Sequence, residues 1–471
     1  MVTFTEMYSE KGQVLRVIEG YKFSFHKRLR DGKQRFKCTK NSCKCYVIFN
    51  ADGSTAVDKT QGHEHNFDTP DTLVRQKLSN ALKRKAVDNL SEKPAKIIRR
   101  ALLEDGTDDV THTDIQRIRR NLYEARSRVR PPLPHSLAEL HTSLNSYDRL
   151  TTNKGERFLL VNDTHKNIII FSSPSNLEYL SSSPTILVDG TFKSVPALFK
   201  QLFTIHGLRF GRYVPLVFCL LPSKESAIYE AAFHHIVAEV VDIGHSMQPE
   251  VCYVDFEEGI HKAVQSVWPA TIIRGCRFHL GQSWWRHIQL YSLSEDYKNQ
   301  SSDIGNYLKM FFGLPFLHPA DVEDCFLDDL LPMKGTDPTG NEFNADPRVK
   351  NFTDYIFRTY IGPNSKFPPH MWAEYSSSIA RTTNPCEAFH SHFNSDFYSA
   401  HPNIFVFIEN ILEIQCETYA KMLDAKKFKK PAVSQQKEKI IATLMNRRDL
   451  GELNRLEFLK RVSYKFLPFR N

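Results

Sequence analysis

Ile186-Leu187-Val188-Asp189 is a continuous apolar run that ends on an acid, and Val251-Cys252-Tyr253-Val254-Asp255 repeats the pattern. Short apolar runs of this kind are typical of strands that are buried on both faces of a sheet. Between them lie an expected antiparallel strand pair, at 203–205 and 214–218, and a helix with one apolar face. A second helix and a strand at 271–273 follow. This order predicts a mixed α/β sheet.

The two aspartates follow strands that we expect to be neighbours in this sheet. Their carboxylates would then emerge side by side where Asp189 and Asp255 end the two runs. Two magnesium ions held about 3.5 to 4 Å apart need shared carboxylate oxygens of this kind, and a third carboxylate to complete the site. The pair therefore indicates a candidate centre for metal-dependent phosphoryl transfer.

A helix expected to begin near Asn384 offers the third carboxylate. Glu387, His390 and Asn394 fall on one face of it, at spacings of three and four residues. The opposite face carries Phe389, Phe393 and Phe397. We expect the aromatic face to pack and the polar face to point toward the aspartates.

Five segments in this order resemble the Mutator-like element (MULE) transposase domain over roughly residues 180 to 410. They are 188–192, 214–224, 254–257, 275–280 and 381–387. The resemblance implies an RNase H-like fold with a helical insertion before the last acid. It also implies that Asp189, Asp255 and Glu387 are Asp-Asp-Glu ligands of Mg²⁺ or Mn²⁺.

The family's Cys-x-x-His pair falls on Cys276 and His279. An accessory role beside the acids is one interpretation of this pair. A buried cysteine and a hydrogen-bonded histidine at a strand end are the other. Trp284-Trp285 follows, and we expect it to pack in a helix, with base stacking as the alternative.

The N-terminal part carries a separate set of metal-binding residue types. Cys38 and Cys43 are followed about twenty residues later by His63 and His65, which supplies two thiolates and two imidazoles for one tetrahedral zinc ion. The surrounding sequence resembles the FLYWCH-type zinc finger, with Phe36 at the usual tryptophan position. Cys45 offers a substitute thiolate.

Bulk composition agrees with a protein of several domains that acts on a polyanion. The chain has 471 residues, 41% of them hydrophobic and 25% charged, and a net charge of +8. No apolar run is long enough for a membrane span, and the first residues lack the features of a secretory signal. We therefore expect an intracellular protein without disulfides or a membrane partner.

The segment after the zinc ligands is basic and helical, and it resembles a helix-turn-helix in outline. Arg117, Arg119 and Arg120 could contact DNA phosphates, or they could form a solvated face. Lys83-Arg84-Lys85 is a minimal nuclear-targeting patch. The expected domains are a zinc module (1–70), a basic helical segment and linker (71–134), the first part of the core (135–290), a helical insertion (291–378), the Glu387 helix with the next core helix (379–425), and a basic helical C-terminal region (426–471).

Together these features predict a nuclear DNA transposase that needs Zn²⁺ in its N-terminal module and Mg²⁺ or Mn²⁺ in its core. The core would hydrolyse a phosphodiester bond and then transfer the strand. Joining two DNA ends implies a homo-oligomer. The alternative is a domesticated, catalytically silent DNA-binding regulator derived from a transposase.

Overall fold

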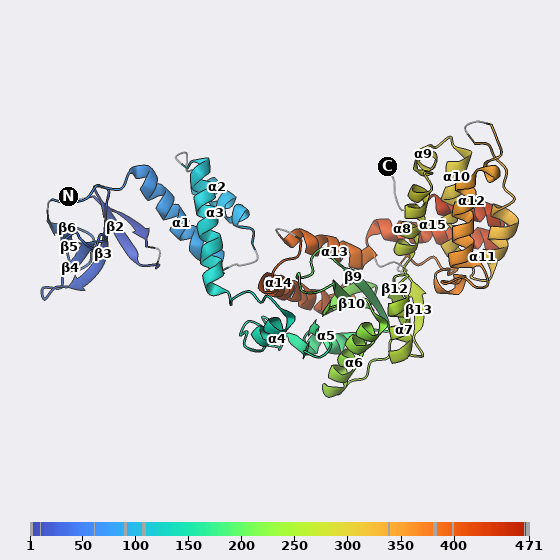
Figure 1. Ribbon diagram of the computed structural model, residues 1–471, viewed down its shortest axis with the longest axis horizontal. Helices are drawn as coiled ribbons and strands as arrows, with labels where there is room; N and C mark the ends of the chain where they lie inside the picture. Colours follow the sequence, from blue (N-terminus) through green and yellow to red (C-terminus); the bar gives the residue numbers. More distant parts are fainter. Residues whose placement is uncertain are drawn as a thin grey trace. The chain divides into compact units, whose positions relative to one another are not determined.

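The chain forms two compact units, residues 1–133 and 134–471, whose elements are labelled in Figure 1. At Asp105, Asn384, Pro385 and Glu387 only the backbone is described. The computed structural model describes residues 3–9, 11–60, 62–88, 92–105, 110–337, 340–379, 384–397, 400–465 and 467.

The first unit opens with an antiparallel meander of six strands in sequence order. Glu19 and Gly20 both have positive φ (51° and 80°), the two-residue turn geometry that suits the twist of a hairpin. One sheet face builds a small core around Phe23, Phe36 and Phe49. The strands are β1 (Thr5–Tyr8), β2 (Val14–Ile18), β3 (Tyr21–Arg28), β4 (Gln34–Cys38), β5 (Tyr46–Phe49) and β6 (Ala56–Lys59).

Three helices complete the first unit: α1 (Pro70–Asp88), α2 (Pro94–Asp105) and α3 (His112–Val129). The expected helical segment is present, but it has one more break than the pair we predicted, since Pro94 starts a new helix. Buried Arg126 stabilises that break by donating to the carbonyls of Ala86 (2.8 Å) and Glu92 (2.7 Å). Leu73 of α1 packs on the sheet, so strands and helices share one unit.

The second unit is built on a seven-stranded sheet in the order β13-β12-β9-β10-β11-β8-β7. β12 is parallel to β9 and β13, and the other neighbours are antiparallel, so the predicted mixed sheet is confirmed. The β7–β8 edge is an addition that we did not predict. The strands are β7 (Leu159–Asp163), β8 (Ile168–Phe171), β9 (Thr185–Thr191), β10 (Gln201–Arg209), β11 (Arg212–Leu221), β12 (Val251–Val254) and β13 (Ile272–Gly275).

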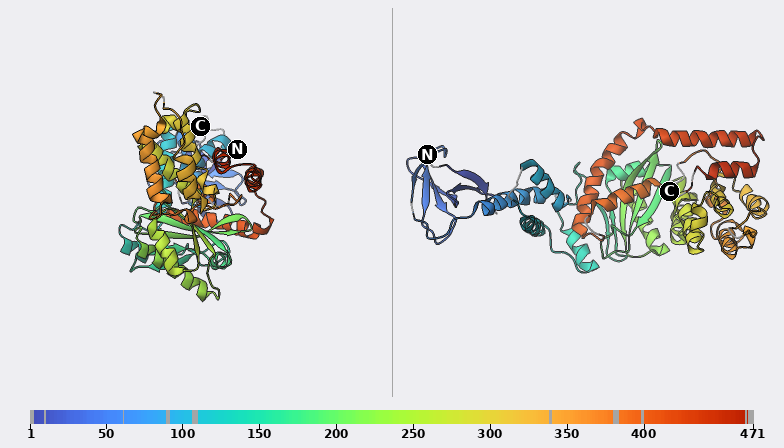
Figure 2. Two further views of the ribbon diagram at one scale, coloured as in Figure 1. Left: turned by 90° about the vertical axis from the view of Figure 1, so that its right-hand side faces the viewer. Right: turned by 90° about the horizontal axis from the view of Figure 1, so that it is seen from above.

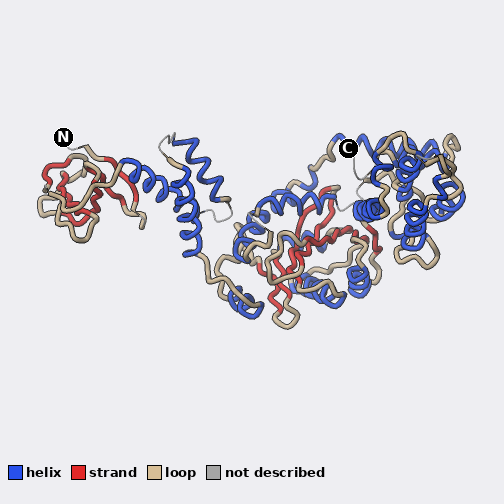
Figure 3. Tube along the Cα trace, turned by 45° about the horizontal axis from the view of Figure 1, so that its top comes forward, coloured by secondary structure: helices blue, strands red, loops and turns tan. Residues whose placement is uncertain are grey.

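Helices cover both faces of this sheet, as Figures 1 and 3 show. One face packs on α5 (Pro174–Ser181), α6 (Ser226–Asp242) and α7 (Glu258–Val267). The other packs on α4 (Leu137–Asn145), α13 (Asn384–Asp396) and α14 (Ile404–Leu423). Phe393 of α13 and Phe397, which directly follows this helix, are buried there, as the aromatic face predicted.

The predicted insertion is helical and shares a single core with the C-terminal helices, which lie beside it in Figure 2. Trp284 is fully buried in this core, so it packs rather than stacks on bases. The α-helices are α8 (Arg277–Leu290), α9 (Ser294–Lys298), α10 (Asp303–Phe311), α11 (Asp321–Asp324), α12 (Pro347–Ile356), α15 (Ala432–Asp449) and α16 (Arg455–Ser463). Short 3₁₀ and π segments of the second unit are η1 (Leu314–Phe316), η2 (Cys325–Leu330), η3 (Phe343–Ala345), η4 (Phe357–Ile361), η5 (Pro369–Met371) and η6 (Ala425–Lys427).

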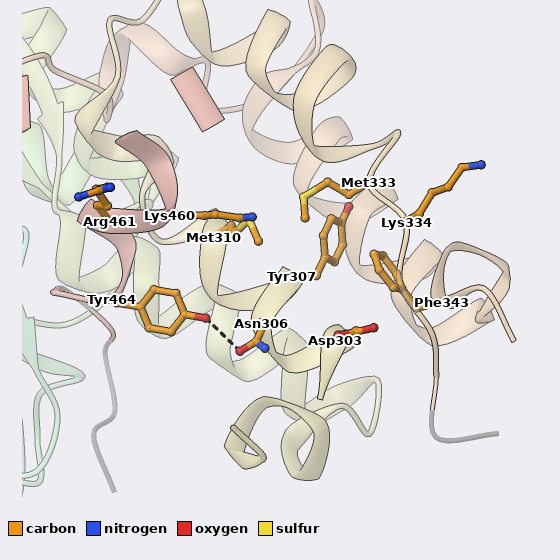
Figure 4. Close-up of a pocket in the computed structure, with 10 residues that line it drawn as sticks. All are labelled: Asp303, Asn306, Tyr307, Met310, Met333, Lys334, Phe343, Lys460, Arg461 and Tyr464. Atoms are coloured by element: carbon orange, nitrogen blue, oxygen red, sulfur yellow. Dashed lines mark hydrogen bonds between the residues drawn. The ribbon is translucent and has the colours of Figure 1, made fainter. Parts of the chain in front are cut away.

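A cavity of about 540 Å³ lies between α10, η3 and α16 (Figure 4). Its lining mixes Asp303 with Lys460 and Arg461, and the Tyr464 hydroxyl donates to Asn306 Oδ1 at 2.9 Å. The lining thus carries both signs of charge. Among the described helices of the whole chain, none combines the length and apolar character needed to cross a bilayer.

Candidate functional site

Cys38, Cys43, His63 and His65 converge in the first unit. Cys38 ends β4, Cys43 lies in the turn before β5, and the histidines follow β6. One ligand atom from each lies within 4.8 Å of the other three. Cys38 Sγ to His65 Nε2, Cys43 Sγ to His63 Nδ1, and the two ring nitrogens to each other all measure 3.3 Å.

These separations fit a tetrahedral zinc ion, whose ligands at about 2.0 to 2.3 Å from the metal must lie roughly 3.3 to 3.8 Å apart. The histidine tautomers agree. His65 Nδ1 lies 2.9 Å from the carbonyl of Asn66, which can only accept, so Nδ1 carries the proton and Nε2 presents its lone pair. The cluster could therefore bind zinc.

The ring of Tyr21 holds one of these ligands in place. It stacks on His63 with ring centres 3.6 Å apart and planes 4° from parallel. Cys45 lies in the neighbouring core and is not one of the four converging residues. Burial raises the pKa of its thiol, as it does for Cys38, so this shift does not distinguish the two cysteines.

Asp189 and Asp255 lie at neighbouring strand ends in the second unit. Asp189 is in β9, and Asp255 comes directly after β12. The parallel ladder pairs Val251 with Thr185 and Tyr253 with Leu187, and two further steps of this register bring Asp255 level with Asp189. Asp189 is buried and Asp255 is half-buried, so the two carboxyl groups meet in a place with little water.

His390 of α13, which is far from Asp189 in the sequence, also lies at this site. Its Nδ1 lies 3.1 Å from Asp189 Oδ2, and its Nε2 lies 2.9 Å from the Thr204 hydroxyl of β10. His206 Nε2 lies 3.2 Å from the same hydroxyl, and burial lowers the pKa of His206 to about 3. Neutral His206 and Thr204 thus lie on the side of His390 away from Asp189 and help to fix the orientation of its ring.

The two carboxyl groups have opposite pKa shifts. Burial works to raise the pKa of Asp189, but the hydrogen bond and charge of His390, together with the charge of His279, lower it below its usual value. Burial first, then the charges of Glu257 and Asp189, raise the pKa of Asp255 to about 6. Such divergence between adjacent acids is common at functional sites.

The two residues of the Cys-x-x-His pair lie in different surroundings. His279 Nε2 lies 3.9 Å from Asp189 Oδ1, which puts the imidazole beside the acids. Cys276 is fully buried at the start of α8, where its backbone N–H donates to the Val254 carbonyl at 2.7 Å. His279 thus lies beside Asp189, whereas Cys276 is buried at the start of α8, and the roles of both residues stay predictions.

The side chains of Asn384 and Glu387 lie outside the described part of the chain. The helix that carries them is described: α13 begins at Asn384 and contacts β9. Glu387 precedes His390 by three residues, about one helical turn. Among the described residues, the acids and histidines of this site do not form a second group as compact as the Cys/His cluster.

Sequence reasoning anticipated His390 and His279 near the acids, but it assigned no role to the other groups that surround them. Glu257 accepts from Lys224 Nζ at 2.6 Å and from the Tyr229 hydroxyl at 2.9 Å, and its charge acts on Asp255. Glu257 and Lys224 belong to the segments that resemble the MULE family, at 254–257 and 214–224. Their membership of these segments was the feature of the sequence that could have pointed to a role near the acids. Thr204 and His206 carried none.

The three arginines proposed for DNA contact are all exposed on α3. Arg117 and Arg120 line a groove of about 730 Å³ in the first unit, and Arg119 is not among the described residues that line it. Arg120 also lies 3.7 Å from Glu124 one turn ahead.

The second unit is therefore an α/β domain with an acidic pair at the ends of two parallel strands. Residues 185–283 match the MULE transposase domain, which relates this part of the chain to transposases and implies an interaction with DNA. The matched range holds Asp189, Asp255, Cys276 and His279. No curated protein matches the chain.

Proposed function

We propose that this protein is a DNA transposase of the MULE type, which cuts DNA at element ends and transfers the strands with the help of divalent metal ions. One observation carries the proposal: the register of two neighbouring parallel strands brings Asp255, directly after β12, level with Asp189 of β9, inside the range that matches the MULE domain. Two carboxylates so placed can share metal ions between them.

The proposed fold of the core is RNase H-like. Its support is the strand order β11-β10-β9-β12-β13, in which the first three strands are antiparallel and the last two run parallel to β9. The α9–α12 segment would then be the insertion that precedes the third acid. The proposal places Glu387 on α13 as that acid.

The donor set fits Mg²⁺ or Mn²⁺. Hard divalent ions prefer carboxylate oxygens, and two adjacent acids in a buried place repel each other unless a cation or a proton lies between them. The raised pKa of Asp255 expresses that repulsion together with its burial. Asp189, Asp255 and Glu387 would hold the ions, and ions held there supply activation of the attacking oxygen and stabilisation of the leaving one.

The remaining residues of the site position these acids. His390 holds Asp189 Oδ2, and Thr204 fixes the other side of its ring. His279 adds positive charge beside Asp189 when it is protonated, which favours the approach of a phosphate. The carboxylate of Glu257 is held by Lys224 and Tyr229, and its backbone N–H donates to Asp255 Oδ1 at 3.1 Å.

The first unit would bind the DNA. We propose a FLYWCH-type zinc finger, supported by the ligand distances at Cys38, Cys43, His63 and His65. Zinc there would supply folding free energy to a sheet with a small core. The proposed nuclear location rests on Lys83-Arg84-Lys85, and the proposed homo-oligomer on the need to join two DNA ends.

A silent, transposase-derived DNA-binding regulator is the second candidate. The observation in its favour is that the Asp189 oxygens already accept hydrogen bonds, from the Gly190 N–H at 2.9 Å and from His390. The carboxylate is therefore satisfied without a metal ion. Such a protein would bind DNA through its first unit and would not cut.

Cleavage separates the two candidates. The full chain is incubated, with Mg²⁺ or Mn²⁺, with plasmids that carry the DNA flanking its gene. Asp189→Asn, Asp255→Asn and Glu387→Gln should each abolish cleavage without unfolding the protein, because an amide keeps the shape and removes the charge. Their effects should not add.

The matched control is Glu250→Gln, an exposed acid that directly precedes β12, the strand before Asp255. It should cut as the unaltered chain does. Cleavage that persists in all three site variants would refute the assignment of the acids. DNA binding without any metal-dependent cleavage by the unaltered chain would favour the regulator.

A further inference from the structure

The groove in the first unit is built by strands and helices together. Lys22 of β3 donates to Gln76 of α1 at 2.7 Å, and Asn80 of α1 donates to the Tyr8 carbonyl of β1 at 2.8 Å. On the other side, Asn121 of α3 donates to the Ser79 hydroxyl of α1 at 3.1 Å. Sheet, α1 and α3 therefore form the walls of one groove of about 730 Å³.

The charge of this groove has one sign. Among the described residues that line it there are six cations and no carboxylate. The cations come from a strand connection, a strand and two helices: Lys11, Lys22, Arg75, Lys83, Arg117 and Arg120. Asparagine, glutamine, serine and threonine side chains between them add neutral hydrogen-bond donors.

These cations differ in what they do for the fold. Lys22 lies 3.0 Å from Asp68 and Arg75 lies 3.2 Å from Asp114, so these two help to hold the walls together. Lys11 and Arg117 are exposed at the groove. The exposed pair of Arg120 with Glu124 is worth little and would yield readily to a phosphate.

We propose that this groove binds the phosphate backbone of duplex DNA, with the strand side and α3 contacting the same DNA segment. Several cations with interspersed amide and hydroxyl donors are what a run of phosphates requires. The inference rests on the proposed function, which supplies DNA as the polyanion. It adds that the zinc-bearing sheet and the basic helices are one binding surface, where the sequence indicated two.

Zinc and DNA binding are then linked. Lys11, in the connection of β1 to β2, and Lys22 of β3 belong to the same sheet as β4, which ends at Cys38, so loss of zinc should remove one wall of the groove. The helices alone would retain only part of the affinity.

The test measures DNA binding by the full chain, with a fluorescently labelled duplex and a range of salt concentrations. Lys11→Gln and Arg117→Gln should each weaken binding and each reduce the slope of log K against log salt by about 1. Both residues are exposed, so both variants should keep their zinc. The matched control, Arg99→Gln, removes an exposed cation from α2, outside the groove, and should leave the slope unchanged.

The outcomes separate this inference from the proposed function. Steep, salt-dependent DNA binding that Lys11→Gln and Arg117→Gln alter no more than Arg99→Gln would overturn the groove and leave the transposase proposal standing. Absence of DNA binding by the unaltered chain would overturn both. A groove that prefers duplex RNA or an acidic peptide over duplex DNA, with the same residue dependence, would overturn the assignment of DNA.

Discussion

The two candidate metal sites differ in what surrounds their proposed ligands. The Cys/His cluster joins a strand end and loops around a small core, with ligand atoms already within 4.8 Å of one another. Asp189 lies near the end of β9 and Asp255 directly after β12, in a sheet with large cores on both faces. From this difference we expect zinc to be needed for folding of the first unit. We expect the sheet of the second unit to fold without a metal ion, at a free-energy cost for the buried charge of Asp255.

The largest expected effect is the loss of zinc. Cys38→Ala with His63→Ala should unfold the zinc module, because structural zinc supplies on the order of 10 kcal/mol in small modules and the core here is small. Metal analysis and limited proteolysis of the full chain would measure it. Cys416→Ala, at an exposed cysteine of the second unit, is the control and should keep zinc and fold. A double variant as protease-resistant as the unaltered chain would refute the structural role.

At the acids the comparison predicts that a substitution increases the free energy of unfolding instead of lowering it. Asp255→Asn should stabilise the metal-free protein at about pH 8. Because folding raises the pKa of Asp255 from 3.8 to about 6, the folded state binds this proton more tightly than the unfolded state. The ionised form of Asp255 therefore lowers the free energy of unfolding. This loss of stability is absent below the unfolded pKa, grows between the two pKa values and is complete above about 6, where it is on the order of 3 kcal/mol.

Urea unfolding of Asp255→Asn and of the unaltered chain would measure this difference at about pH 8 and about pH 5, where it should shrink. Glu250→Gln again serves as the control, since it is exposed. Mn²⁺ should reduce the difference in unfolding free energy between the two proteins, because it should stabilise only the unaltered chain. A destabilised Asp255→Asn protein at the higher pH would show that the acid is not strained.

A smaller effect is expected at His390. His390→Gln removes the imidazole that holds Asp189 Oδ2, so manganese affinity should fall by about 10- to 100-fold, as for other groups that orient a ligand. Calorimetric titration of the full chain with Mn²⁺ would measure it. His392→Gln, exposed on the same helix, is the matched control. Equal affinities in the two variants would remove His390 from the site.

Local sequence predicted what depends on spacing along the chain. The Cys and His positions predicted a four-residue cluster, and apolar runs ending in Asp189 and Asp255 predicted two neighbouring strand ends. FLYWCH membership, the RNase H-like fold and the role of Glu387 stay predictions.

Features that depend on packing between distant segments were beyond the sequence. His390 and Thr204 are 186 residues apart and meet because α13 packs on the sheet. The C-terminal helices join the insertion through a shared apolar core that no local pattern distinguishes from an ordinary amphipathic helix. The basic groove likewise needs β3, α1 and α3 in place before its charges gather.

The central claim is that Asp189 and Asp255 hold catalytic metal ions, and anomalous scattering from crystals soaked in Mn²⁺ tests it most directly. The account predicts manganese bound to both aspartates, with Glu387 completing the site and, if two ions bind, about 3.5 to 4 Å between them. Folded crystals with no manganese at these carboxylates, and with His390 still on Asp189 Oδ2, would contradict it.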